Sequence, residues 1–395
     1  MTEQRRRAVP RDRDQDYTPG LARRRREFVR EMTGAELNHV ASYSLSETTL
    51  PGNIENFVGV AQVPIGVAGP LRINGEHARG DYYVPLATTE GTLVASYNRG
   101  MRLLTESGGV RATVVDERMQ RAPVFVLGDA LEARNFGTWL ERHQRQIAAV
   151  AQATTSVGRL VEVERHAVGP LLYLRFDFTT GDAAGQNLVG RATYAACEWI
   201  QREHPDHPRY VLSGAIDTDK KHSQINMLRT RGRRVIAEAT LPATLLQERV
   251  GVRPEQLFRA RQYSQVGAFM AGSANNGAQA ANGLAALFIA TGQDVAAVAE
   301  AHAGVVYSQV TESGDYYWSI TLPALVVATV GGGVGLATQR ECLEMLGCFG
   351  PGKAHAFAEV CAGVVLAGEV SLSSAVLAGD WVTSHERLGR KRGTG

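Results

Sequence analysis

Cysteine is scarce in this sequence, with four residues among 395. Cys197, Cys342, Cys348 and Cys361 lie in apolar, helix-like segments. Their spacing matches neither a zinc site nor the framework of a small disulfide-rich protein. We therefore expect four reduced thiols in the core.

A metal-ligand pattern is missing as well. His204 and His207 form a His-x-x-His, but Pro205 and Pro208 interrupt any helix that would place both rings on one face, and no third ligand follows. The sequence therefore predicts no metal.

Net charge is low, because 42 basic and 40 acidic residues leave a formal charge of +2. The basic excess gathers in residues 5–26, where acidic residues interrupt it, so we expect a disordered basic arm over residues 1–26 and no nucleic-acid partner. No apolar core of a signal peptide follows Met1, and the longest apolar runs are too short to span a bilayer. These absences predict a cytoplasmic protein with no membrane contact.

The Gly-x-Gly-x-x-Gly fingerprint of the Rossmann fold is also absent. Gly331, Gly332 and Gly333 come nearest to it, but Leu336 stands where the last glycine should be. Residues 181–187 lie where a strand turns into a helix, and the free backbone N–H groups of that geometry can bind a phosphate.

What is present is a long globular sequence, 44% hydrophobic, with room for two or more domains. Its middle predicts strand 123–127, helix 130–150, strands 160–165 and 171–178, helix 188–202 and strand 210–212. This βαββαβ order is the ferredoxin-like split unit, and its 90 or so residues suffice for an inserted small domain.

The flanking segments predict further elements. We expect helices at residues 27–37, 338–346 and 360–377, with the last one buried because it is almost wholly apolar. Residues 267–291 are helical and rich in Ala and Gly, which permits close helix packing. Residues 225–228 and 233–239 predict a hairpin that turns at 231–232, and residues 321–330 predict a strand.

Four titratable residues are candidates for chemistry, and each has a structural alternative. Glu90 begins an apolar helix, where it could serve as a cap. Lys220, in Asp219-Lys220-Lys221 at a strand end, could be surface charge. Asp294 follows a helix of small residues and could cap its end, while His385 could be a structural histidine.

Together with their neighbours, these residues resemble the 3-hydroxy-3-methylglutaryl-CoA reductase family, from about residue 40 to His385. The resemblance is closest to the class I form, without its membrane anchor. The matching blocks are ENFVG at 55–59, PIGVAGPL at 64–71, ATTEG at 87–91, GDAAGQN at 181–187, DKK at 219–221, GQD at 292–294, TVGGG at 329–333, GEVSL at 368–372 and SH at 384–385.

The resemblance implies an α+β fold, in which a large α/β substrate domain contains an inserted ferredoxin-like βαββαβ nicotinamide-binding domain. We accordingly expect the large domain at residues 27–122 and 213–383, the small domain at 123–212 and a mobile tail at 384–395. It also implies a homodimer or higher homo-oligomer, because the family builds its site between two subunits.

The implied reaction is reduction of 3-hydroxy-3-methylglutaryl-CoA to mevalonate, with two hydride transfers from NADPH and release of coenzyme A. Lys220 would stabilise the developing alkoxide and polarise the aldehyde carbonyl. Glu90 would donate a proton from a buried position, with Asp294 between it and Lys220. His385 would protonate the departing thiolate.

Further positions match the family's binding residues. The implied acyl-binding residues are Arg121, Ser213, Lys221 and Asn282. The implied coenzyme A contacts are Ser96, Asn98 and Arg99. The implied cofactor contacts are Asp182, Gly185, Gln186, Asn187, Gly331, Gly332 and Gly333.

Two departures leave alternatives open. Tyr263 stands where class I enzymes place a lysine of the acyl pocket, so a related branched acyl-CoA is an alternative substrate. Thr155-Ser156 replaces the serine-arginine pair that holds the 2′-phosphate of NADPH, with Arg159 as the nearest cation, so NADH and an oxidative direction are alternatives. A non-catalytic protein that binds coenzyme A esters is a third, although it would need neither a proton donor nor a thiolate protonator.

Overall fold

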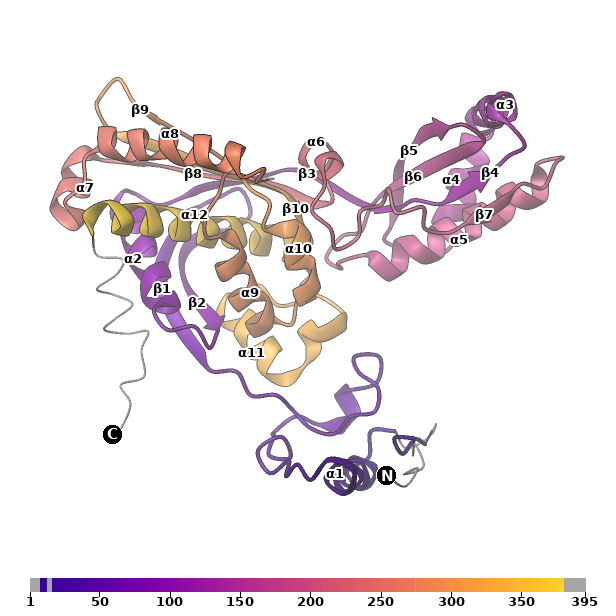
Figure 1. Ribbon diagram of the computed structural model, residues 1–395, viewed down its shortest axis with the longest axis horizontal. Coiled ribbons are helices and arrows are strands. Elements are labelled where there is room, and N and C mark those ends of the chain that lie inside the picture. Colours follow the sequence, from indigo (N-terminus) through magenta and orange to yellow (C-terminus); the bar gives the residue numbers. More distant parts are fainter. Residues whose placement is uncertain (1–7, 13–15, 274, 380–395) are drawn as a thin grey trace.

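The computed structural model describes residues 8–12, 16–273 and 275–379. Figure 1 shows a large domain built around β8, β10 and α12 and a smaller one that contains α3 to α5, with β3 running from one to the other. This mixture of helices and sheets in two domains confirms the predicted fold class.

The helices are α1 (Pro19–Thr33), α2 (Leu93–Glu106), α3 (Ala130–Arg142), α4 (Gln144–Gln152), α5 (Gln186–Glu203), α6 (Gln224–Leu228), α7 (Ala243–Val250), α8 (Pro254–Met270), α9 (Ala280–Thr291), α10 (Val298–Ala301), α11 (Ala337–Met345) and α12 (Ala354–Ala378), with 3₁₀ turns η1 (Glu47–Thr49), η2 (Val295–Ala297) and η3 (Gly332–Gly335). The strands are β1 (Ile65–Asn74), β2 (Arg79–Ala87), β3 (Arg111–Arg121), β4 (Val124–Val126), β5 (Arg159–Val168), β6 (Leu171–Thr179), β7 (Arg209–Val211), β8 (Gly232–Leu241), β9 (Val305–Val310) and β10 (Tyr316–Leu325).

The small domain has the strand order β7-β4-β6-β5, with every neighbouring pair antiparallel. This is the ferredoxin-like order that the βαββαβ pattern predicts. The expected helix 130–150 is two helices, because the chain leaves helical geometry at His143, where φ is −107°. Strand β6 also pairs with the end of β3, which joins the small sheet to β8, β10 and β9 of the large domain.

The predicted hairpin at residues 225–239 is wrong. Its first half forms the short helix α6, because the Ser223 hydroxyl accepts a hydrogen bond from the N–H of Asn226 and caps the first turn. Its second half, β8, pairs instead with β3 on one side and with β10 on the other. The predicted strand 321–330 is shifted as well, since β10 ends at Leu325.

The prediction of a disordered arm over residues 1–26 is also wrong for those residues of the segment that the structure describes. Helix α1 begins at Pro19, after the Thr18 side chain caps it. The Arg25 side chain is fully buried and donates hydrogen bonds to the carbonyl oxygens of Pro10 and Phe57 and to Asp16. A guanidinium with this many acceptors ties the segment to the rest of the fold, and α1 replaces the helix expected at residues 27–37.

Helix α12 forms the centre of the large domain, between β8 and β10 on one side and α2 and α9 on the other (Figure 1). The expectation that every apolar run is too short to span a bilayer is wrong for α12, which is long and apolar enough to cross a membrane. However, 78% of its apolar window is buried within the protein, as in the core helix of a globular fold. At Gly100 of α2 a Cβ atom would lie 1.8 Å from the carbonyl oxygen of Ala367, so the two helices touch through their backbones.

Candidate functional site

Lys220 and Asp294 form an ion pair, with 2.7 Å between Nζ and Oδ2. Lys220 lies in the loop after β7, and Asp294 lies between α9 and η2, where its carboxylate also accepts the N–H of Ala296. The hydrogen bond to Asp294 raises the pKa of Lys220, which keeps its ammonium charged. Both side chains are about 40% exposed, at 40% and 39%, so the pair is open to a substrate.

Glu90 lies in the turn between β2 and α2. Its backbone N–H donates to the Thr88 hydroxyl, and its side chain is exposed. Within the described chain, its carboxylate forms no hydrogen bond or ion pair with Lys220 or Asp294. Glu90 is therefore exposed within one chain and not buried as expected, while its place beside Asp294 and Lys220 stays a prediction. His385 lies outside the described residues.

Two predicted acyl-binding residues converge on a third residue that the sequence did not reveal. Arg121, at the end of β3, donates from Nη1 to Oδ2 of Asp217 at 3.0 Å, and the Ser213 hydroxyl donates to the same oxygen at 3.1 Å. Asp217 is almost fully buried. In the sequence, the only sign of this contact was the position of Asp217, an acid four residues after Ser213 and two before Asp219.

The other two predicted acyl-binding residues make no contact with this group in the described chain. Lys221 is exposed, and its Nζ lies 3.0 Å from the carbonyl oxygen of Asp219. Asn282 lies on the first turn of α9 and is half-buried.

The three residues predicted to contact coenzyme A all lie on α2. The Ser96 hydroxyl lies 3.1 Å from that of Ser371 on α12, and Arg99 donates from Nε to the same hydroxyl at 3.1 Å. The Asn98 side chain accepts the N–H of Gly69 at 2.9 Å. The polar groups of these three side chains thus form hydrogen bonds with α12 or with β1 of the same chain.

A cavity of about 530 Å³ brings together most of the predicted cofactor residues. Its lining includes residues 183–188, 292–294 and 330–334. Gly185 is the N-cap of α5, with a φ of 88°, so the first turn of that long helix, with its free backbone N–H groups, lies at the cavity. At Gly331 and Gly332 an added Cβ atom would meet nothing within 4 Å, which leaves the backbone open to a ligand.

Asp182 and Gln186 have internal partners. The Asp182 carboxylate accepts the N–H groups of Gly352 and Ala354, at 2.8 and 3.1 Å, and so ties the loop before α5 to the start of α12. The Gln186 amide donates to Oδ1 of Asp219 at 3.1 Å. Gln186 therefore connects the cavity with the loop that carries Lys220.

A buried charge cluster lies beneath that loop. Arg231 donates to Glu300 and to Asp219, each at 2.7 Å, and the Arg231 and Glu300 side chains have no exposed surface. Burial raises the pKa of Glu300 to about 7, against the opposing effect of Arg231. The sequence predicted neither Arg231 nor Glu300 as a site residue, because a single charged residue in a sequence does not reveal a buried partner.

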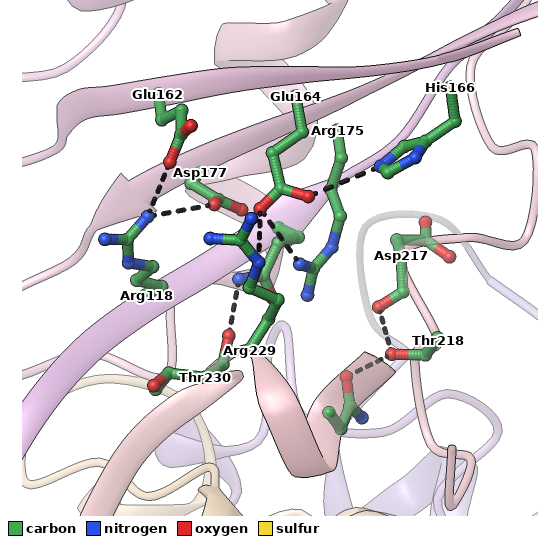
Figure 2. A network of polar contacts seen from close by, with 12 residues as sticks. Arg118, Glu162, Glu164, His166, Arg175, Asp177, Asp217, Thr218, Arg229 and Thr230 are labelled. Atoms are coloured by element: carbon green, nitrogen blue, oxygen red, sulfur yellow. Dashed lines mark hydrogen bonds and ion pairs between the residues drawn. The ribbon is translucent and has the colours of Figure 1, made fainter. Parts of the chain in front are cut away.

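A second charged network lies where β3 passes between the domains (Figure 2). Arg118 bridges Glu162 and Asp177, at 3.0 and 3.4 Å. Glu164 faces Arg175, Arg229 and His166. Glu162, Glu164 and Asp177 lie close enough to one another to hold a metal ion, but arginines already neutralise them. We interpret this network as structural.

Comparison with known proteins gives one consistent result. A family model described as hydroxymethylglutaryl-coenzyme A reductase matches residues 21–390. The chain is 44% identical to the 3-hydroxy-3-methylglutaryl-coenzyme A reductase of Pyrococcus horikoshii over 375 residues, covering 93% of this chain and 91% of that one. It is 43% identical to the protein of that name from Methanothermobacter thermautotrophicus over 369 residues, with 93% and 92% covered.

A solved structure agrees on the fold. The class II 3-hydroxy-3-methylglutaryl-CoA reductase from Streptococcus pneumoniae, bound to NADPH in open conformations, superposes with a TM-score of 0.66. The match covers 83% of this chain and 79% of that one at 18% identity, which supports the shared architecture.

Proposed function

The chain belongs to the hydroxymethylglutaryl-coenzyme A reductase family, and we propose that it reduces 3-hydroxy-3-methylglutaryl-CoA to mevalonate with NADPH, releasing coenzyme A. The observation that carries this proposal is the Lys220–Asp294 ion pair, in which Asp294 also lines the glycine-rich cavity. In the proposed reaction, the Lys220 ammonium beside this cavity would lie where the nicotinamide and the thioester carbonyl meet.

In this proposal the cavity holds the nicotinamide dinucleotide. Residues 185–187 would offer backbone N–H groups to its phosphates at the start of α5, and Gly331 to Gly333 would lie against it without side chains in the way. When bound, NADPH supplies the hydride for each of the two reductions. Asp182 would act by holding the loop in place, since backbone N–H groups already occupy its carboxylate.

We assign to Lys220 the stabilisation of negative charge on the carbonyl oxygen of the substrate. Its ammonium would face the thioester oxygen as negative charge develops there, and later the oxygen of the aldehyde. Asp294 keeps that ammonium charged and oriented through the 2.7 Å contact. Arg121 and Lys221 would offer charge-assisted hydrogen bonds to the substrate carboxylate, with Arg121 oriented by Asp217.

Glu90 would donate the proton to the carbonyl oxygen, and His385 would protonate the coenzyme A thiolate. Because Glu90 is exposed and its carboxylate makes no hydrogen bond or ion pair with Lys220 among the described residues, we propose that a second copy completes the site and buries this carboxylate. A homo-oligomer would then be the active form, with Glu90 of one subunit facing Lys220 of the other.

An apolar surface supports assembly with a second copy. Tyr263, Val266, Phe269 and Met270 of α8 are all exposed, from 61% at Val266 to 86% at Phe269. Contiguous exposed apolar side chains of this size are typical of a protein–protein interface.

We also propose that the protein acts in the cytoplasm.

The choice of NADPH over NADH rests on the turn before β5. Arg159 begins that strand, and Arg191 of α5 donates from Nη2 to the carbonyl oxygen of Thr154 at 2.5 Å, so two cations flank residues 154–158. We expect Arg159→Ala to raise the KM for NADPH about tenfold, the scale of one lost charge-assisted contact, and to leave the KM for NADH unchanged.

The deciding experiment follows oxidation of NADPH and of NADH by the purified chain with 3-hydroxy-3-methylglutaryl-CoA. Formation of mevalonate and free coenzyme A, with two molecules of cofactor oxidised per molecule of substrate, would support the proposal. Absence of turnover with both cofactors would refute it and favour a protein that only binds coenzyme A esters.

A further inference from the structure

Lys220 is held at two points by one short segment of chain, residues 294–300. Asp294 binds its ammonium at 2.7 Å, and Oε1 of Glu300 accepts its backbone N–H at 3.4 Å. Asp294 precedes η2, and Glu300 lies in α10, which follows η2 directly. The same segment therefore restrains both the side chain and the backbone of the lysine.

The backbone at this point needs restraint. Lys220 has a φ of 55°, and Thr218 and Ala215 of the same loop have φ values of 57° and 68°. These left-handed conformations are unfavourable for residues with a Cβ atom, and they persist where surrounding contacts enforce them. Glu300 provides such a contact at the lysine itself.

Glu300 is in turn fixed by Arg231. The Nε of Arg231 donates to Oε2 of Glu300, and its Nη2 donates to Oδ1 of Asp219, both at 2.7 Å. Its third contact, from Nη1 to the carbonyl oxygen of Gln120 at 3.3 Å, anchors the guanidinium to β3. Arg231 thus binds Asp219, the residue before Lys220, directly. It is linked to Lys220 itself through Glu300.

We propose that Glu300 and Arg231 are positioning residues for the reduction, and that they act by fixing the backbone of residues 219–220 so that the Lys220 ammonium meets Asp294 and the substrate oxygen. This inference rests on the proposed function, since it assigns the lysine to that chemistry. A buried ion pair contributes little net stability compared with apolar residues of the same volume, whereas it does fix the positions of the atoms that it joins.

The test uses the full chain with Glu300→Ala and Glu300→Gln. Glu300→Ala removes both acceptor oxygens, so we expect kcat to fall about 100-fold, the scale of a small misplacement of a catalytic group, while both KM values stay within about twofold. Glu300→Gln keeps one acceptor for the two donors, and we expect it to recover roughly tenfold of that loss.

Glu359→Gln is the matched control for loss of a buried carboxylate. Glu359 is fully buried in α12, and its carboxylate accepts the N–H groups of Glu76, His77 and Ala78, far from the lysine loop in sequence. We expect this variant to melt at a lower temperature while its kcat stays within about twofold of wild type, which separates lost stability from lost positioning.

Three results would overturn the inference: a kcat for soluble Glu300→Ala within twofold of wild type, a loss that lies in KM, or an equal fall in kcat for Glu359→Gln. If Glu300→Ala does not fold, Glu300→Gln decides, and an unchanged kcat overturns the inference. These results all require an active wild-type chain. An inactive wild-type chain would instead refute the proposed function, and this inference with it.

Discussion

The Lys220 side chain is 40% exposed, so its removal takes little buried surface from the fold and tests chemistry separately from folding. We expect Lys220→Ala to lower kcat at least about 1,000-fold, because the oxyanion loses its cation. We expect the free energy of unfolding to change by less than about 1 kcal/mol, the usual limit for an exposed ion pair. Steady-state kinetics and urea denaturation would check both, with the exposed Lys353→Ala as control.

Asp294 sets the protonation of its partner. The hydrogen bond from Lys220 to Asp294 is the largest cause of the raised pKa of Lys220. Asp294→Asn keeps an acceptor oxygen but removes the negative charge, which weakens this hydrogen bond, so the pKa of Lys220 falls and the ammonium deprotonates at lower pH. We therefore expect the alkaline limb of the pH profile of kcat/KM to move to lower pH. An alkaline limb at the wild-type position would show that Asp294 does not control this lysine.

For single residues, the sequence predicted which side chains belong to the site better than it predicted which residues they contact. Lys220 and Asp294 belong to short motifs that resemble the family, and they meet in the structure. Asp217 and Glu300 lie in no motif that we recognised, and their roles depend on buried contacts across 80 or more positions of the chain, as between Glu300 and Lys220. The long-range contact of Glu300 leaves no local pattern in a single sequence, whereas the acid at position 217, four residues after Ser213, was a local signal.

Among the elements, the pair α2 and α12 depends on a glycine. Because a Cβ atom at Gly100 would lie 1.8 Å from a backbone oxygen of Ala367, we expect Gly100→Ala to separate the helices and to destabilise the protein by about 3 kcal/mol or more. Gly190 lies inside α5 with nothing within 4 Å of an added Cβ atom, so we expect Gly190→Ala to stabilise the protein by about 0.5–1 kcal/mol. Urea denaturation of both variants would reveal opposite shifts.

Elements with a strong periodic pattern were predicted well, and those set by capping or by distant contacts were not. Helix α5 and strands β5 and β6 lie within two or three residues of their expected bounds, because their apolar residues repeat at helical or strand spacing. The predicted hairpin failed because Ser223 caps a helix turn where the apolar residues favoured a strand. The expected arm failed because its Arg25 finds buried acceptors that a count of charges does not reveal.

For the whole molecule, the proposed second copy has a direct consequence. If Glu90 of one subunit completes the site around Lys220 of the other, two inactive variants should restore each other. In an equal mixture of Glu90→Gln and Lys220→Ala chains, half of the dimers are hybrids, and each hybrid has one site with both native residues. We therefore expect about a quarter of the wild-type activity after joint refolding or co-expression.

The matched control pairs Lys220→Ala with Asp294→Asn. These two side chains lie 2.7 Å apart within one chain, so they belong to the same site of a dimer. Every site of a hybrid then lacks one of them, and we expect no activity beyond the sum of the two parents. Recovery in this control would place Lys220 and Asp294 in different sites. No recovery in the Glu90 mixture would mean that Glu90 and Lys220 act within a single subunit. Because both residues belong to the large domain, a rearrangement within that domain would then have to bring them together.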